Sequence, residues 1–142
     1  MTKKTKKIED LLKMPVNKFH PLVYIGGKPK IGRNVYIGFF SEVNAKGAEV
    51  KIGDNCDIAS FVSINVADSH LRAIGLSFGI ERRDIVLENN VFVGSHSFIG
   101  GGVHVGHHSV VAAGTVISKA IVIPPYSLAV GNPFVIKKDY FK

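Results

Sequence analysis

Aliphatic residues return at every sixth position along most of this chain, a period that fits neither an amphipathic α-helix nor the simple alternation of a strand. From Val93 onward the sixes read Val-Gly-Ser-His-Ser-Phe, Ile-Gly-Gly-Gly-Val-His, Val-Gly-His-His-Ser-Val and Val-Ala-Ala-Gly-Thr-Val. A six-residue period predicts a parallel β-helix, in which each hexapeptide forms one short strand and one corner. We expect three hexapeptides to form one coil of a triangular prism.

The repeated aliphatic residue is the anchor of each hexapeptide, and every anchor is Ile, Leu or Val: Ile25, Ile31, Ile37, Val43, Ile52, Ile58, Ile64, Leu87, Val93, Ile99, Val105, Val111, Ile117 and Ile123. The residue four positions later is mostly small or β-branched, so both positions are predicted to point into the core. A small residue, most often Gly, follows the anchor, where we expect a corner whose backbone geometry favours Gly. The number of anchors predicts between four and five coils.

The period also predicts how the chain is organised, as a single domain over residues 1–142. Residues 1–24 form a lead-in segment with a short amphipathic helix over 4–14, ended by Pro15. The β-helix is expected over 25–127, with three extra residues at 46–48 and a protruding loop over 67–83. Residues 128–142 are expected to be a C-terminal tail.

Composition narrows the classes of protein. The chain is 46% apolar with 15 Gly and no Trp, which suits a narrow β-rich core with many tight corners. Its net charge of +7 favours anionic partners such as phosphorylated small molecules. The basic residues are not interleaved with stacking aromatics, so we expect no nucleic-acid partner.

No apolar run approaches the about 20 residues of a membrane span, and charges interrupt the N-terminal apolar stretch, so no signal peptide is expected. We therefore expect a cytoplasmic protein without a membrane partner. The single cysteine, Cys56, excludes an internal disulfide and falls at a core position, where we expect a small buried hydrophobe rather than a nucleophile.

Several phenylalanines fall on the expected flat faces of the prism. A prism this narrow buries little apolar surface alone, so such faces predict association with copies of the same chain. The residues are Phe39, Phe40, Phe61, Phe92 and Phe98.

Together these motifs resemble the hexapeptide-repeat acyltransferases, in particular the sugar O- and N-acetyltransferases. The likeness covers about residues 25–138 and includes the Ile/Val-Gly repeats, the interrupting loop with Ser69-His70, the run from Asn90 to Gly94, and Pro124-Pro125-Tyr126 followed by Gly131-Asn132-Pro133. The resemblance implies a left-handed parallel β-helix and a homotrimer with active sites between subunits. It also implies acetyl-CoA as the acyl donor, a sugar hydroxyl or amine as the acceptor, and no metal.

His70 is the candidate general base, because imidazole titrates near neutrality and the residue lies on the loop that leaves the rigid prism. The resemblance places the family's catalytic His at this point. His96, which lies within the repeats, is the alternative base. Asp68 is either an orienting group for the imidazole or a turn residue.

Further residues are candidates for binding the acceptor and the donor. Asn44 resembles the acceptor-binding Asn of the family, and Asn65 is a further acceptor candidate. The loop arginines Arg72, Arg82 and Arg83 are candidates for binding a diphosphate. For acetyl-CoA the resemblance implies backbone contacts at small residues and basic or Pro contacts beyond them: Gly101, Gly102, Ala112, Ala113, Gly114, Lys119, Pro133 and Lys137.

Departures from the family pattern affect the expected acceptor. Many relatives have Trp where this chain has Phe92, and Pro where it has Leu71. These differences favour a nucleotide-linked deoxy- or amino sugar of a surface polysaccharide, such as O-antigen, over a simple galactoside or maltose. Two alternative functions remain. One is a γ-carbonic-anhydrase-like metalloprotein that binds zinc through His, and the other is a structural β-helix subunit without catalysis.

Overall fold

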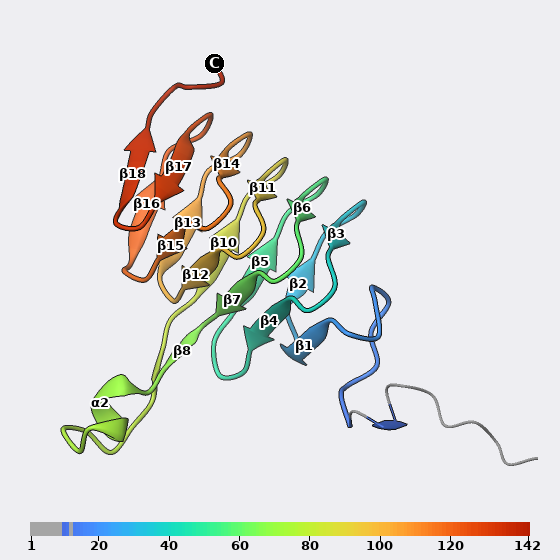
Figure 1. Ribbon diagram of the computed structural model, residues 1–142, viewed down its shortest axis with the longest axis vertical. Helices are drawn as coiled ribbons and strands as arrows, with labels where there is room; N and C mark the ends of the chain where they lie inside the picture. Colours follow the sequence, from blue (N-terminus) through green and yellow to red (C-terminus); the bar gives the residue numbers. More distant parts are fainter. Residues whose placement is uncertain (1–9, 12) are drawn as a thin grey trace, which may run out of the picture.

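The computed structural model describes residues 10–11 and 13–142, and the chain forms a left-handed parallel β-helix (Figure 1). The expected helix over 4–14 lies for the most part outside the described residues. Within the part of the chain that the structure describes, no helix combines the length and the apolar character needed to cross a membrane.

Three sheets form the faces of the prism, and the chain visits them in the order A, B, C through five coils. Sheet A contains β1 (Tyr24–Gly27), β4 (Glu42–Ala45), β7 (Ser63–Asn65), β12 (Phe98–Gly100) and β15 (Val116–Ile117). Sheet B contains β2 (Lys30–Ile31), β5 (Val50–Ile52), β10 (Ile85–Leu87), β13 (Val103–Val105) and β16 (Ile121–Ile123). Sheet C contains β3 (Tyr36–Ile37), β6 (Asp57–Ile58), β11 (Phe92–Val93), β14 (Val110–Val111), β17 (Leu128–Gly131) and β18 (Phe134–Lys137).

The core consists of stacked anchors. Ile64, Ile99 and Ile117 are aligned in register in successive coils of sheet A, and all three side chains are fully buried. The position four after the anchor also points inward, because Ser97, Thr115 and other small residues there are buried. Cys56 is among them, as expected, and its thiol donates a hydrogen bond to the Glu88 carbonyl.

Glycine follows an anchor for a different structural reason from the corner geometry that we predicted. The residues with positive φ lie two positions further on, at Asn55 and His96 for example, and Gly94 is not among them. A Cβ on Gly94 would instead lie 2.3 Å from the backbone nitrogen of Ala113 in the next coil. The repeat therefore requires glycine there so that the coils can approach one another.

We call the corner between sheets A and B the first corner, that between B and C the second, and that between C and A the third. Both interruptions of the period lie at the first corner. Residues 46–48 follow β4, and the longer insertion follows β7. This insertion begins with β8 (Ala67–Asp68), continues into α2 (His70–Ala73), and returns through β9 (Glu81–Arg82), which pairs antiparallel with β8. The loop projects well away from the prism, as predicted (Figure 1).

The prism continues beyond residue 127, the last residue of the predicted β-helix. Strand β17 pairs parallel with β14, and Ala129 in β17 is fully buried. Strand β18 then pairs antiparallel with β17, so residues 128–137 form a hairpin on sheet C. The Pro and Gly residues over 124–133 favour an exit from the β-helix, but Ala129 takes the place of the next anchor within that stretch.

Candidate active site

His70 begins α2, directly after β8 leaves the prism. Its Nδ1 atom lies 2.6 Å from Oδ1 of Asp68, and the same oxygen accepts a hydrogen bond from the His70 backbone N–H at 3.0 Å. These bonds hold the pKa of Asp68 below its usual value, the backbone bond contributing most and the side-chain bond next. Asp68 therefore remains a carboxylate at neutral pH.

An ionised Asp68 fixes the tautomer of neutral His70. A carboxylate only accepts hydrogen bonds, so the shared proton lies on Nδ1 and the lone pair on Nε2. A neutral imidazole in this form can take a proton at Nε2. Both side chains are more than half exposed, so the pair is open to a substrate.

The pair borders a cleft of about 520 Å³ between the base of the loop and the prism. The loop and its return to the prism supply Asp68, His70 and Arg83. The prism supplies Asn65, Phe98 and the small residues Gly100, Gly101 and Ser118.

Two predicted acceptor residues, Asn44 and Asn65, are stacked in adjacent coils. The Asn44 amide donates to Oδ1 of Asn65 at 3.1 Å. Each side-chain oxygen also accepts from a backbone N–H two residues ahead, at Lys46 and Ala67 respectively. Asn65 lines the cleft, and Asn44 positions its amide from the coil below.

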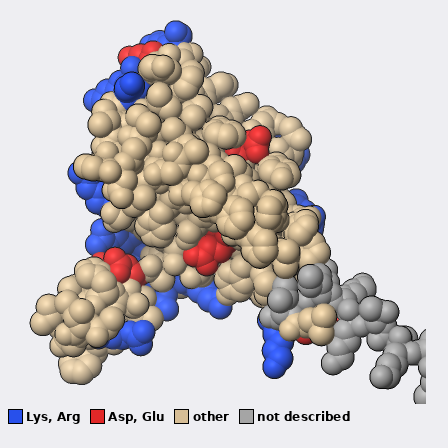
Figure 2. Space-filling view, viewed as in Figure 1, with Lys and Arg blue, Asp and Glu red and all other residues tan. Residues whose placement is uncertain are grey.

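The three loop arginines differ in where they lie. Arg72 is exposed on α2, and Arg82 donates through Nε to the Lys46 carbonyl at 3.0 Å, so neither lines the His70 cleft. Arg83 does line it, with Nη2 3.1 Å from Oε2 of Glu81. A basic and an acidic group lie side by side where the loop meets the prism (Figure 2).

Of the three loop arginines that the sequence offers for a diphosphate, only Arg83 lines the cleft. Gly100 and Ser118 were not among the residues predicted from the sequence, and they follow the anchors Ile99 and Ile117, which stack above Ile64. Register alone therefore places Gly100 and Ser118 above Asn65, a signal that the sequence contains. Nothing in the sequence distinguishes Arg83 from its neighbour Arg82, because the choice depends on where the loop rejoins the prism.

The predicted donor-binding residues lie in three places. Gly101 and Gly102 occupy the first corner beside the His70 cleft, whereas Ala112, Ala113 and Gly114 lie at the third corner after β14. The remaining three lie toward the C-terminal hairpin. Lys119 has its Nζ 5.6 Å from the centre of the Phe134 ring, Lys137 has its Nζ 5.8 Å from that of Tyr140, and Pro133 is exposed in the turn before β18.

The alternative base, His96, lies at the third corner and not in the His70 cleft. It borders a separate, more apolar cleft of about 640 Å³ that also includes Tyr24, Phe40 and Phe61. One chain therefore does not bring the two histidines to the same cleft.

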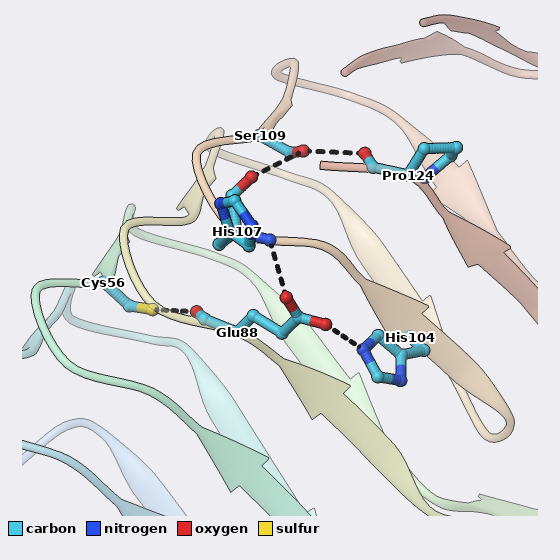
Figure 3. A network of polar contacts seen from close by, with 6 residues as sticks. All are labelled: Cys56, Glu88, His104, His107, Ser109 and Pro124. Carbon is cyan, nitrogen blue, oxygen red and sulfur yellow. Dashed lines mark hydrogen bonds and ion pairs between the residues drawn. The ribbon is translucent and has the colours of Figure 1, made fainter. Parts of the chain in front are cut away.

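The other polar cluster lies at the second corner and joins adjacent coils (Figure 3). The Glu88 carboxylate accepts from Nε2 of His104 and from the backbone N–H of His107, and both contacts lower the pKa of Glu88. Over residues 10–11 and 13–142, no three His, Cys, Asp or Glu side chains are grouped as metal ligands.

Comparison with known proteins finds similarity to hexapeptide-repeat transferases. Residues 84–119 match the bacterial transferase hexapeptide (six repeats) family. The galactoside O-acetyltransferase of Escherichia coli (strain K12) is 37% identical over 119 residues, which cover 80% of this chain and 56% of that protein. The chain spans about half the length of the curated relatives it matches.

Solved structures share the fold. A galactoside acetyltransferase in complex with coenzyme A has a TM-score of 0.71 at 35% identity, covering 85% of this chain and 60% of that one. The polySia-specific acetyltransferase NeuO has a TM-score of 0.65 at 30% identity, covering 82% of this chain and 60% of the other. In its repeat and in its fold, the chain is a hexapeptide-repeat β-helix similar to these acetyltransferases.

Proposed function

We propose that this chain transfers an acetyl group from acetyl-CoA to a hydroxyl or amino group of a sugar, with His70 as general base. The observation that carries the proposal is the His70–Asp68 pair, which presents the Nε2 of His70 at the edge of the cleft between the loop and the prism. The relatives named as acetyltransferases support the reaction class.

The proposed reaction is a direct transfer of the acetyl group from the thioester to the acceptor. Acetyl-CoA supplies the acetyl group as an activated thioester. His70 Nε2 takes the proton from the acceptor oxygen or nitrogen as that atom attacks the thioester carbonyl carbon, and the C–S bond breaks. The proton on His70 then passes to the departing thiolate, which balances the reaction. Cys56 is buried in the core and takes no part.

The small residues at the third corner fit the donor. Ala113 and Gly114 are exposed, Gly114 has a φ of +71°, and a Cβ built on it would find no atom within 4 Å. Backbone there is open to an extended arm that forms hydrogen bonds. Lys119 and Lys137, near the C-terminal hairpin, are suited to the phosphates.

We further propose a homotrimer, because the base and the third-corner donor residues lie on different corners of one chain. A neighbouring copy would bring its Ala113 corner against the His70 cleft. Exposed apolar groups favour such an association, since Ile74, Leu76 and Phe78 at the loop tip are at least 65% exposed.

The acceptor we favour is a nucleotide-linked deoxy- or amino sugar used in the cytoplasm for a surface polysaccharide such as O-antigen. Arg83 in the cleft supports an anionic acceptor, because a guanidinium binds phosphate through two parallel hydrogen bonds. The likeness to an acetyltransferase specific for polySia supports a glycan-related acceptor.

The direct test is release of free thiol from acetyl-CoA in the presence of a panel of sugars and nucleotide sugars, with CoA binding measured by calorimetry. We expect CoA binding and turnover with at least one nucleotide sugar. Absence of any CoA binding would contradict the proposal and favour a structural β-helix without catalysis.

Mixing two inactive variants tests the shared site. His70→Ala removes the base and Ala113→Trp blocks the donor corner, so each homo-oligomer should be inactive. If the site lies between copies, unfolding and refolding the two together should restore part of the activity. No recovery in a mixture shown to contain hetero-oligomers would place the whole site on one chain.

A further inference from the structure

Three aromatic rings stack along the third corner, one from each of three successive coils. Phe40 and Phe61 lie with ring centres 5.4 Å apart and planes at 14°. The His96 ring continues the stack 4.8 Å from Phe61, at 11°. All three residues have φ near +60°, so each occupies the same position of its coil.

The stack ends where the next coil places a glycine. Gly114 is the equivalent of His96 one coil later, since Gly114 N donates to Ser95 O just as His96 N donates to Ser60 O. Gly114 also has positive φ, and a Cβ on it would have no atom within 4 Å. The position above the His96 ring therefore lacks the side chain that every earlier coil supplies there.

The second corner shows what a filled position looks like. There the equivalent residues are Asn34, Asn55, Asn90, His108 and Tyr126, each with positive φ. His108 is covered by Tyr126, with ring centres 5.2 Å apart and planes at 23°. The open position at Gly114 is thus a feature of the third corner and not of the prism as a whole.

A hydrogen-bond relay holds the His96 ring in place. The Ser95 hydroxyl donates to the Ser60 carbonyl at 2.7 Å. Since that hydroxyl has only one proton, it accepts from Nδ1 of His96, 3.0 Å away. The ring is therefore fixed between Ser95 and Phe61 as a preorganised flat surface.

We propose that His96 and Gly114 form a slot for a planar π group of the acyl donor, which takes the position of the missing ring. This rests on the proposed function, because the slot adjoins Ala112–Gly114 at the proposed donor corner. Coils repeat at about 4.8 Å, so a flat group in the slot lies at stacking distance from His96. CoA has two kinds of planar π group that could stack on His96, the adenine ring and the pantetheine amides.

Calorimetric titration of CoA into His96 variants tests the slot without requiring turnover. His96→Ala should weaken binding about 5- to 50-fold, the range expected for one lost stacking contact. His96→Phe keeps a flat ring and should bind within about threefold of the unaltered chain. Gly114→Ala puts a methyl group into the slot and should weaken binding, with circular dichroism and thermal unfolding as checks on its fold.

Two fragments of CoA separate the sources of the planar group. If 3′,5′-ADP alone loses affinity in His96→Ala, the adenine ring occupies the slot, and if 4′-phosphopantetheine alone loses it, an amide does. Unchanged affinity of His96→Ala for CoA and both fragments would overturn the slot while leaving the proposed function intact. Failure of the unaltered chain to bind CoA would overturn both.

Discussion

Asp68 accepts two hydrogen bonds from a single residue, His70, one from its backbone N–H and one from its ring. The two residues are only two apart in sequence, so the turn into α2 sets the orientation of the imidazole locally. The prism is needed to hold the cleft wall opposite. The candidate base is therefore aligned by its own loop and completed by the scaffold.

Replacing the candidate base, His70, should slow turnover strongly. His70→Ala should lower kcat by about 10²- to 10⁴-fold, the usual contribution of general base catalysis. The exposed residue His108 lies at a different corner, and His108→Ala should stay within about twofold of the unaltered chain. Thiol release measures both, and near-normal activity in His70→Ala would remove it from the mechanism.

Replacing Asp68, the hydrogen-bond partner of His70, should change the tautomer of the His70 ring. In Asp68→Asn the amide can donate to Nδ1, which moves the ring proton to Nε2 and leaves no lone pair for the acceptor. We expect kcat to fall about 10- to 100-fold, less than in a buried triad because this pair is exposed. Nitrogen NMR shifts of His70 should report the change of tautomer, and an unchanged tautomer would show that Asp68 acts only as a turn residue.

The role of Arg83 in acceptor binding can be tested with Arg72 as the matched control. Arg83 lines the cleft and Arg72 does not. Arg83→Ala should raise KM for a nucleotide-sugar acceptor about tenfold with little change in KM for acetyl-CoA, while Arg72→Ala leaves both constants near normal. Equal effects of the two substitutions would assign the arginines to general surface charge.

The close approach of the coils can be tested on glycine itself. Gly94→Ala places a methyl group 2.3 Å from the Ala113 nitrogen and should destabilise the fold by about 1–3 kcal/mol or more. The control is Gly79→Ala, because a Cβ there would have no atom within 4 Å. Urea unfolding compares them, and equal stabilities would contradict the stated role of the repeat glycine.

Glu88 should contribute to acid sensitivity. Its pKa is lowered in the folded chain, by the His104 contact first, so its stabilising effect is present above its unfolded pKa and is lost as pH falls through the lower folded value. Glu88→Gln should lower the unfolding midpoint at pH 7 and make its decline below about pH 4.5 shallower. Glu81→Gln in the exposed loop is the control, and identical pH curves for Glu88→Gln and the unaltered chain would exclude this role.

The prism was predictable because the period follows directly from stacking. Each anchor, such as Ile99, must be aliphatic to fill a layer of the core, and this requirement repeats at every coil. The loop was predictable as a break in that period. That Arg83 and not Arg82 lines the cleft was not predictable, because it depends on how the antiparallel strands β8 and β9 twist as the chain returns to the prism. The reason for Gly94 also needed coordinates, since close approach and positive φ both favour glycine.

Every added residue in the prism lies at the first corner, after β4 or β7, and the longer insertion carries His70. The second corner keeps a fixed length in all five coils and the third corner in each of its four occurrences, so their spacing is a property of the scaffold. Length and sequence can change at the first corner without altering the stack. Residues 67–83 thus form an exchangeable cassette, and we expect grafted loops to change acceptor preference while the same prism continues to fold.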